Sequence, residues 1–356
     1  IWAGSWDGGI YFLKKGTTKF INYNTTNTQG GLRSNTVMSF DEDKQGIIWI
    51  GTYHNGLHSY DPKTNRFKQY NSPSFTSLGI PASSLYRVLV DFQDNLWLGS
   101  TQGLFKVTKQ GQGNFSVISM VDRMSLESKN NSASNYILSL YEAQDQTVWI
   151  GTKGAGLCNY LPKTDAFVWY DKFKGLEEEN VCSIIQSLDG NIWIGGNSGI
   201  TKLDISTGES SNFTIDDGLL SNDFNINATF RDNLGSIYFG GYQGVNYFNP
   251  SQIVTNTNET SLYLSEFKLF NEKVLPTQKN SPLSKVISET DSLVLRDNQS
   301  VFTIEYSGIN FTRPEKNEYA YYLEGYEETW NYVGKKRSAT YTNLDPGSYT
   351  FKLKAA

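Results

Sequence analysis

Hydrophobic and polar residues alternate along the chain in short runs that are separated by polar turns. The stretch from residue 35 to residue 70 shows this most clearly, with runs at residues 35–40, 46–52, 56–60 and 66–70. The turns between the runs carry Asp, Asn, Gly and Pro, and few stretches show the i, i+3, i+4 apolar spacing of a helix. The pattern predicts four short β-strands in this stretch and an all-β protein.

This four-strand unit recurs along the chain. Its second strand reads Ile48-Trp49-Ile50-Gly51-Thr52, and related sequences centre on the aromatic residues at positions 2, 49, 97, 149, 193 and 238. Successive copies are 44 to 52 residues apart, a period typical of the four-stranded blades of a β-propeller. We therefore expect six blades, the first without its inner strand. Their Trp side chains should be buried between sheets, and the following glycine should lie against a neighbouring backbone.

The pattern changes near residues 255–261, after a proline and a polar stretch. Beyond this point alternating runs predict strands at residues 262–269, 292–295, 301–306, 318–322, 339–342 and 348–354. Short strands joined by turns such as Asp345-Pro346-Gly347 favour a small immunoglobulin-like β-sandwich. We predict a propeller over residues 1–258 and a sandwich over residues 259–356, truncated at both ends of the chain.

Composition narrows the range of partners. The net charge is -5, and there is no Lys/Arg-rich run, so nucleic acid and anionic membranes are not expected as partners of this chain. No run of about 18 apolar residues occurs, so any membrane anchor would lie in segments outside the chain.

Cys158 and Cys182 are expected to be buried thiols, with a disulfide as the alternative. His54 and His58 lack the further ligands that a metal would need, and no cofactor is expected.

The loops between the second and third strands of the repeats differ from one another, whereas the strands do not. Variable loops on a constant scaffold can encode specificity. Aromatic faces suit the C–H surfaces of sugars, and polar side chains suit hydroxyls or acidic substituents. The predicted ligand-binding residues, including Arg33 at the mouth of an inner strand, are Trp6, Asp7, Arg33, Tyr53, His54, Lys153, Tyr242 and Gln243. The alternative is that each is a solvated turn residue.

The repeat and the last hundred residues carry a family resemblance. The unit Asn-x-Val, polar turn, Ile-Trp-Ile-Gly-Thr, Gly-Leu and Tyr-Asp resembles the two-component regulator propeller repeat over residues 1 to about 255. The segments Tyr319-Ala320-Tyr321-Tyr322-Leu323-Glu324-Gly325 and Tyr341-Thr342-Asn343-Leu344-Asp345-Pro346-Gly347-Ser348-Tyr349 are similar to the three-tyrosine domain that follows such propellers. At strand spacing, the tyrosines of this last domain are expected to form sandwich core, with their hydroxyls bonded to backbone.

The resemblance implies the periplasmic sensor region of a Bacteroides-type hybrid two-component system, part of an inner-membrane protein. Such proteins have two seven-bladed propellers, a sandwich, one membrane helix and a cytoplasmic histidine kinase. They detect glycan-derived oligosaccharides. The resemblance further implies a homodimer. It also implies that the chain is a fragment with six of the seven blades, and that an upstream segment supplies the seventh blade and the missing inner strand of the first. The fragment itself would be a binding region and not an enzyme.

Two other functions are compatible with a propeller. A sialidase-type or lyase-type enzyme is one, but the sialidase turn places Asp five residues before Trp, where this chain has Lys44 before Trp49, with Asp43 one place too early. A glycosidase also needs a pair of carboxyl groups, which the scattered loop acids do not indicate, so no catalytic residue is assigned. The other alternative is a scaffold that binds a protein on the same face.

Overall fold

Two units make up the computed structural model, which describes residues 1–70, 84–110, 114–125, 135–171, 175–253, 261–309 and 317–355. The units are Ile1–Ile253 and Val254–Ala356. Of the expected boundary at residues 255–261, all but Ser261 lies outside the described residues.

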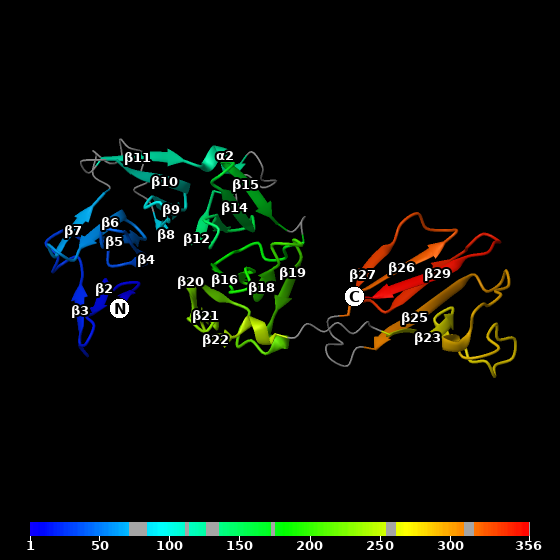
Figure 1. The fold of residues 1–356 in the computed structure, drawn as a ribbon. Helices are drawn as coiled ribbons and strands as arrows, with labels where there is room; N and C mark the ends of the chain where they lie inside the picture. The colour runs from blue at the N-terminus through cyan, green and yellow to red at the C-terminus, as the bar shows by residue number, and fades with distance from the viewer. Residues whose placement is uncertain are drawn as a thin grey trace. The chain divides into compact units, whose positions relative to one another are not determined.

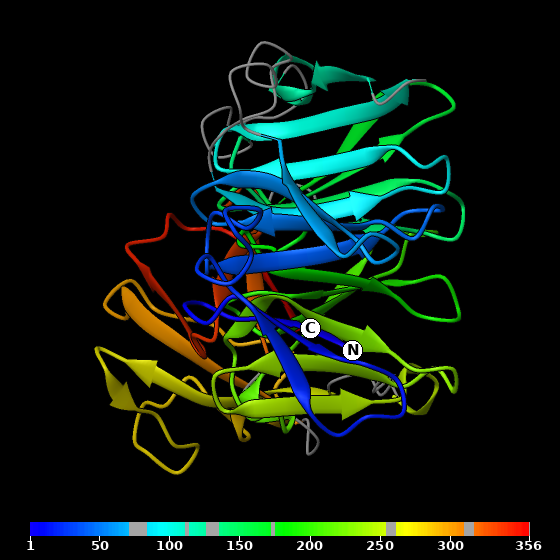
Figure 2. The same ribbon diagram turned by 90° about the vertical axis from the view of Figure 1, so that its left-hand side faces the viewer.

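The first unit consists of six antiparallel sheets that follow one another in chain order (Figure 1), and Figure 2 shows the same sheets from the side. Among the described residues the first and last sheets have three strands and the others four. The strands are β1 (Trp2–Gly4), β2 (Ile10–Leu13), β3 (Phe20–Tyr23); β4 (Val37–Glu42), β5 (Ile48–Thr52), β6 (Gly56–Asp61), β7 (Arg66–Gln69); β8 (Leu85–Val90), β9 (Leu96–Ser100), β10 (Gly103–Gln110), β11 (Asn114–Ser119); β12 (Ile137–Glu142), β13 (Val148–Thr152), β14 (Leu157–Leu161), β15 (Ala166–Tyr170); β16 (Ser183–Gln186), β17 (Ile192–Gly195), β18 (Ile200–Leu203), β19 (Ser210–Phe213); and β20 (Phe224–Arg231), β21 (Ile237–Gly241), β22 (Gly244–Phe248). Short helical turns α2 (Val121–Ser125), η3 (Ile215–Asp217) and η4 (Pro250–Gln252) complete the unit. The predicted propeller architecture of β-blades is confirmed.

The repeated Trp side chains are buried, as predicted. Trp49, Trp97, Trp149 and Trp193 are at most 3% exposed. The residue six places earlier accepts the indole N–H in three of these blades: Asp43 Oδ2 at 2.8 Å, Asp91 Oδ2 at 2.9 Å and Ser187 Oγ at 3.1 Å. The other carboxylate oxygen, Oδ1, of Asp43 and of Asp91 accepts a backbone amide of the turn before the second strand. One side chain therefore fixes both the turn and the ring that packs between sheets.

The glycine that follows Trp by two residues is needed because the adjacent sheet passes close to it. A Cβ on Gly151 would lie 2.5 Å from the carbonyl oxygen of Val181, and a Cβ on Gly51 would lie 3.0 Å from Val88 Cγ2. The contact therefore involves side chains of the next sheet as well as its backbone.

The inner strands carry β-bulges that the sequence pattern did not reveal. The registers of β4 with β5, β8 with β9 and β12 with β13 all shift around one extra residue, which is Met38, Tyr86 and Leu138 respectively. A bulge turns its extra side chain away from the plane of the strand. Met38, Tyr86 and Leu138 accordingly pack in one cluster with Cys182 and Ile226 of the last two sheets. We call these five residues the axial cluster.

The second unit has two antiparallel sheets with strand orders β24-β23-β25-β28 and β27-β26-β29. Their strands are β23 (Ser261–Leu269), β24 (Glu272–Lys273), β25 (Val301–Ile309), β26 (Tyr319–Glu324), β27 (Asn331–Gly334), β28 (Ser338–Thr342) and β29 (Thr350–Ala355), and η5 (Ile287–Glu289) is a short helical turn. This matches the predicted sandwich, with β24 and β27 as additional strands.

One predicted strand of this unit is wrong. Residues 292–295 form no strand, although Leu293 and Leu295 pack against the core around Phe267 and Ile304. The alternation of hydrophobic and polar residues there arises because two leucines are partly buried on an irregular segment. It does not arise from strand pairing.

The tyrosines of the second unit mostly form its core, as expected. Tyr306, Tyr319 and Tyr341 are buried together. The Tyr319 hydroxyl accepts the Gly308 amide at 3.0 Å, and the Tyr349 hydroxyl donates to the Asp345 carbonyl at 2.9 Å. Tyr341 departs from the expectation, because its hydroxyl donates to the Glu327 carboxylate at 3.4 Å.

Cys158 and Cys182 are both buried and are not joined in a disulfide. None of the described helices has the length and hydropathy needed to cross a bilayer.

Candidate functional site

On one face of the first unit, the loops between second and third strands meet the starts of the inner strands. Backbone hydrogen bonds join the two segments in three sheets: Tyr53 N to Thr36 O (3.1 Å), Thr101 N to Ser84 O (3.4 Å) and Lys153 N to Tyr136 O (2.9 Å). We call this the loop face. Because the sheets supply both segments, side chains on these loops are held on a rigid scaffold.

A continuous row of rings crosses the loop face over four successive sheets. The Trp6 ring lies 5.2 Å from Tyr53, the Tyr53 ring 5.9 Å from Tyr86, and the Tyr86 ring 5.5 Å from Tyr136. Lys153 Nζ lies 5.0 Å above the Tyr136 ring, and His54 packs edge-on to Tyr53 at 4.5 Å. These separations are those of favourable ring–ring and cation–π contacts. The six residues Trp6, Tyr53, His54, Tyr86, Tyr136 and Lys153 are called the aromatic arc.

The arc is anchored at its centre and open at its ends. Tyr86 is buried and its hydroxyl bonds the Tyr136 hydroxyl at 2.7 Å. Burial raises the pKa of Tyr86, and the hydrogen bond to Tyr136 adds to this effect, so the phenol stays neutral. Trp6 is 60% exposed, and His54 and Lys153 are exposed. The ends can therefore meet a ligand while the middle holds their geometry.

The structure thus brings together four of the eight predicted residues, namely Trp6, Tyr53, His54 and Lys153, and joins them through Tyr86 and Tyr136. Arg33 lies beside the β5–β6 loop that carries Tyr53 and His54. Its carbonyl accepts a hydrogen bond from Asn55 Nδ2 at 2.9 Å, and its side chain is exposed.

The remaining three predicted residues make none of the contacts that define the arc. Asp7 is exposed in the β1–β2 turn. Tyr242 and Gln243 are exposed in the β21–β22 turn, Tyr242 by 85%, and neither contributes to the ring contacts found among the described residues.

Tyr86 and Tyr136 were not among the residues predicted from the sequence. Both sit at the mouth of an inner strand, in slots where the second repeat has Met38 and Thr36. Aromatic residues at these variable positions were the available signal, but the bulge that aims Tyr86 at its neighbours has no signature in the pattern.

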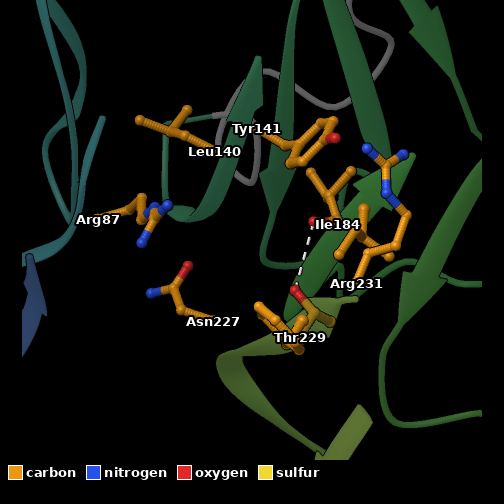
Figure 3. Close-up of a pocket in the computed structure, with 9 residues that line it drawn as sticks. Arg87, Leu140, Tyr141, Ile184, Asn227, Thr229 and Arg231 are labelled. Atoms are coloured by element: carbon orange, nitrogen blue, oxygen red, sulfur yellow. Dashed lines mark hydrogen bonds between the residues drawn. The ribbon is translucent and has the colours of Figure 1, made fainter. Parts of the chain in front are cut away.

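A cavity of about 280 Å³, which we call the axial cavity, lies among the inner strands β8, β12, β16 and β20 (Figure 3). It is lined by Arg87, Leu140, Tyr141, Ile184, Ile185, Asn227, Thr229, Phe230 and Arg231. At one side the β20 strand bulges over residues 225–228, where Asn227 has φ +57°. Asn227 N bonds the Cys182 carbonyl at 2.9 Å, and Asn227 Nδ2 bonds the Tyr86 carbonyl at 2.8 Å. The bulge therefore ties the last sheet to the third and links the cavity to the aromatic arc.

The buried carboxyl groups of the unit hold loops and strands. Glu178 is 2% exposed and accepts the amides of Asn180 at 2.8 Å and Ser198 at 2.7 Å. Burial raises its pKa against these hydrogen bonds. With its oxygens committed to backbone, Glu178 is placed to fix the β17–β18 turn and not to transfer protons. Across the described part of the chain, no three His, Cys, Asp or Glu side chains converge as metal ligands would.

Family models match three segments of the chain. The model described as two component regulator propeller matches residues 31–54 and 131–154, and the model described as Y_Y_Y domain matches residues 310–356. The two propeller matches include the loop residues Tyr53, His54, Tyr136 and Lys153.

Whole-chain comparisons find relatives that are longer than this chain. Histidine kinase P4 of Formosa agariphila is 28% identical over the whole chain, which spans 26% of that protein. The extracellular domain of a B. thetaiotaomicron protein described as a hybrid two component system shares the fold, with a TM-score of 0.56, 20% identity, and coverage of 100% of this chain and 51% of its own. PorZ, a surface component of the type-IX secretion system of Porphyromonas gingivalis, also shares the fold, with a TM-score of 0.55, 14% identity, and coverage of 99% of this chain and 49% of its own.

Proposed function

We propose that this chain, which carries two-component regulator propeller repeats and a Y_Y_Y domain, is the ligand-sensing region of a hybrid two-component sensor kinase. The support is the matched domain pair, the histidine kinase relative and the shared fold with the extracellular domain of a hybrid two component system. On this proposal the region lies outside the cytoplasm, in the periplasm, and the kinase and membrane helix belong to other parts of a longer protein.

The ligand we propose is a glycan-derived oligosaccharide bound on the loop face. The observation that carries this proposal is the aromatic arc, which comprises one exposed indole, phenol rings in edge-on and tilted contact, and a lysine, over four adjacent sheets. An exposed indole face with polar side chains nearby suits a chain of sugars, because the Trp6 ring can cover C–H surface while His54 and Lys153 bond hydroxyls. Binding there would be passed on through the second unit. A homodimer remains a prediction that sedimentation equilibrium can test.

The fold by itself does not choose this function, since PorZ shares it and is a component of a secretion system. A protein-binding scaffold is therefore the second candidate. The third is a carbohydrate-active enzyme, which is disfavoured by the role of Asp43, whose oxygens hold Trp49 and Lys109 and two backbone amides.

Calorimetric titration against a panel of oligosaccharides separates the three candidates. A sensor region gives heat with one glycan class and releases no new reducing ends, an enzyme releases them, and a scaffold gives heat with no sugar. Trp6→Ala should weaken binding about tenfold, or by about 1–2 kcal/mol, because it removes a ring face. Phe20→Ala is the matched control, since Phe20 is 51% exposed at the opposite end of its sheet, paired with Leu13. Equal affinities of the two variants would contradict a site on the arc.

A further inference from the structure

The axial cavity contains a guanidinium group that the fold leaves without a full set of partners. Arg87 extends from β8 into the cavity, and Figure 3 shows it facing Asn227 and the residues of β20. Its Nε is buried and has no hydrogen-bond partner among the described residues. Buried polar atoms in native proteins are nearly always bonded, so an orphaned guanidinium nitrogen beside a cavity calls for an external acceptor.

The side chains that line the cavity carry a net positive charge. Arg87 and Arg231 both line it, whereas no carboxylate does. Arg231 is held away from the centre because its Nη1 donates to the Gln186 carbonyl. Asp41, whose charge acts on Arg87, already accepts the Val90 amide at 2.8 Å, and it makes no ion pair with Arg87 among the described residues. Burial lowers the pKa of Arg87, and the Asp41 charge only opposes this in part.

The other polar groups of the cavity can take hydroxyls. Asn227 donates its Nδ2 to Tyr86, which leaves its Oδ1 directed toward the cavity (Figure 3). Thr229 Oγ1 makes only a long bond of 3.5 Å to the Ile184 carbonyl. Tyr141 supplies an aromatic wall. An occupant with one anionic group and several hydroxyls would satisfy these partners together.

The size and opening of the cavity limit the occupant further. A volume of about 280 Å³ is at the small end for ligand sites, so it admits a monosaccharide and not an oligosaccharide. Phe230, which lines the cavity, is 62% exposed, so the cavity communicates with solvent.

From this arrangement we propose that the axial cavity is a second binding site, distinct from the aromatic arc, for a carboxylate-bearing monosaccharide of the uronic acid class. The planar carboxylate pairs with the guanidinium fork of Arg87, and ring hydroxyls bond Asn227 Oδ1 and Thr229 Oγ1. Arginine suits this role because its fork matches a carboxylate with two parallel hydrogen bonds.

The test is a titration of the protein with sodium galacturonate, galactose and sodium sulfate at constant ionic strength. The site predicts saturable 1:1 binding of galacturonate, at least tenfold weaker binding of galactose, and weaker binding of sulfate. Arg87→Met should abolish galacturonate binding, whereas Arg66→Met, the same change at an exposed position on β7, should leave it unchanged. Trp6→Ala should also leave it unchanged, so failure here and failure of the oligosaccharide site are distinguishable.

Arg87→Lys keeps the charge and removes the fork, and it provides a second measurement if Arg87→Met does not fold. It should weaken galacturonate binding at least tenfold, with a melting temperature close to that of the unaltered protein. Four outcomes would overturn the proposal: no galacturonate binding, equal binding of galactose, binding of sulfate as tight as that of galacturonate or tighter, or galacturonate binding of unchanged affinity in either folded Arg87 variant. If galacturonate does not bind, the role left for Arg87 is to offset the charge of Asp41.

Discussion

In two blades a single carboxylate at the turn between the inner and second strands bonds both the turn and the buried Trp. Asp91 accepts the amides of Gln93 at 3.0 Å and Asn95 at 2.8 Å as well as the Trp97 indole N–H at 2.9 Å. The fourth blade has Ala143 in this slot, 5% exposed, and still buries Trp149. The carboxylate therefore stabilises a blade without being required to form one.

Asp91→Ala should lower the free energy of unfolding by about 2–4 kcal/mol, because it leaves a buried indole N–H and two turn amides unsatisfied. Chemical denaturation measures the change. Asp61→Ala is the control, since Asp61 caps an exposed turn through Lys63 N and Thr64 Oγ1 and should cost less than about 1 kcal/mol. Similar losses in both variants would contradict the proposed role of Asp91.

His58 makes the propeller sensitive to acid. It is fully buried on β6, where its Nε2 accepts the Arg33 amide at 3.3 Å. Burial lowers its pKa from 6.5 to about 4. Between pH 6.5 and about 4, His58 is protonated in the unfolded chain but stays neutral in the folded protein. The free energy of unfolding that is present above pH 6.5 is therefore partly lost as the pH falls toward about 4.

The contribution has a slope of at most about 1.4 kcal/mol per pH unit within this window. His58→Gln keeps an acceptor near the Arg33 amide and cannot titrate. Denaturation curves between pH 7 and pH 4 should therefore fall less steeply for His58→Gln than for the unaltered protein. Parallel curves would show that His58 does not titrate as described.

At the scale of the element, the fit of adjacent sheets depends on the glycine of each second strand. Gly151→Ala should destabilise the protein by about 3 kcal/mol or more, because the new methyl would lie 2.5 Å from the Val181 carbonyl oxygen and overlap Ser139 Oγ. Gly240→Ala changes the same slot of the last blade, where the methyl would meet Ala228 Cβ at 3.1 Å and the Ala228 carbonyl oxygen at 3.6 Å. Thermal unfolding of the pair should show a much smaller loss for Gly240→Ala, and equal losses would refute the close-packing account.

The elements were largely predictable from the sequence, and the physical reason is the repeat. A residue such as Trp49 or Trp193 fixes the second strand of its blade, and alternation fixes the neighbouring strands to within about two residues. The bulges at Met38, Tyr86 and Leu138 were not predictable, because an extra residue in a short strand leaves the alternation of its neighbours almost unchanged. The error at residues 292–295 has the converse cause, since alternating burial occurred there without strand pairing.

At the scale of the whole molecule, the sequence located the loop face but only part of its contents. Trp6, Tyr53, His54 and Lys153 were predicted to lie on this face because the loops that carry them differ among otherwise similar repeats. Tyr86 and the cavity around Arg87 were missed because they depend on how inner strands from separate blades converge. The approach of inner strands involves residues far apart in the sequence, so it cannot be read from any one stretch. Variation among loops can be read from each loop by itself.

The central claim is that ligand covers the exposed end of the aromatic arc, and acrylamide quenching of tryptophan fluorescence tests it most directly. Trp6 is 60% exposed, Trp2 and Trp330 are partly buried, and Trp49, Trp97, Trp149, Trp169 and Trp193 are at most 3% exposed, so the most accessible emission comes from Trp6. A saturating oligosaccharide should protect the most accessible emission in the unaltered protein, and Trp6→Phe should lack that emission from the start. An oligosaccharide that binds with measurable heat and leaves Trp6 as accessible as before would contradict the account.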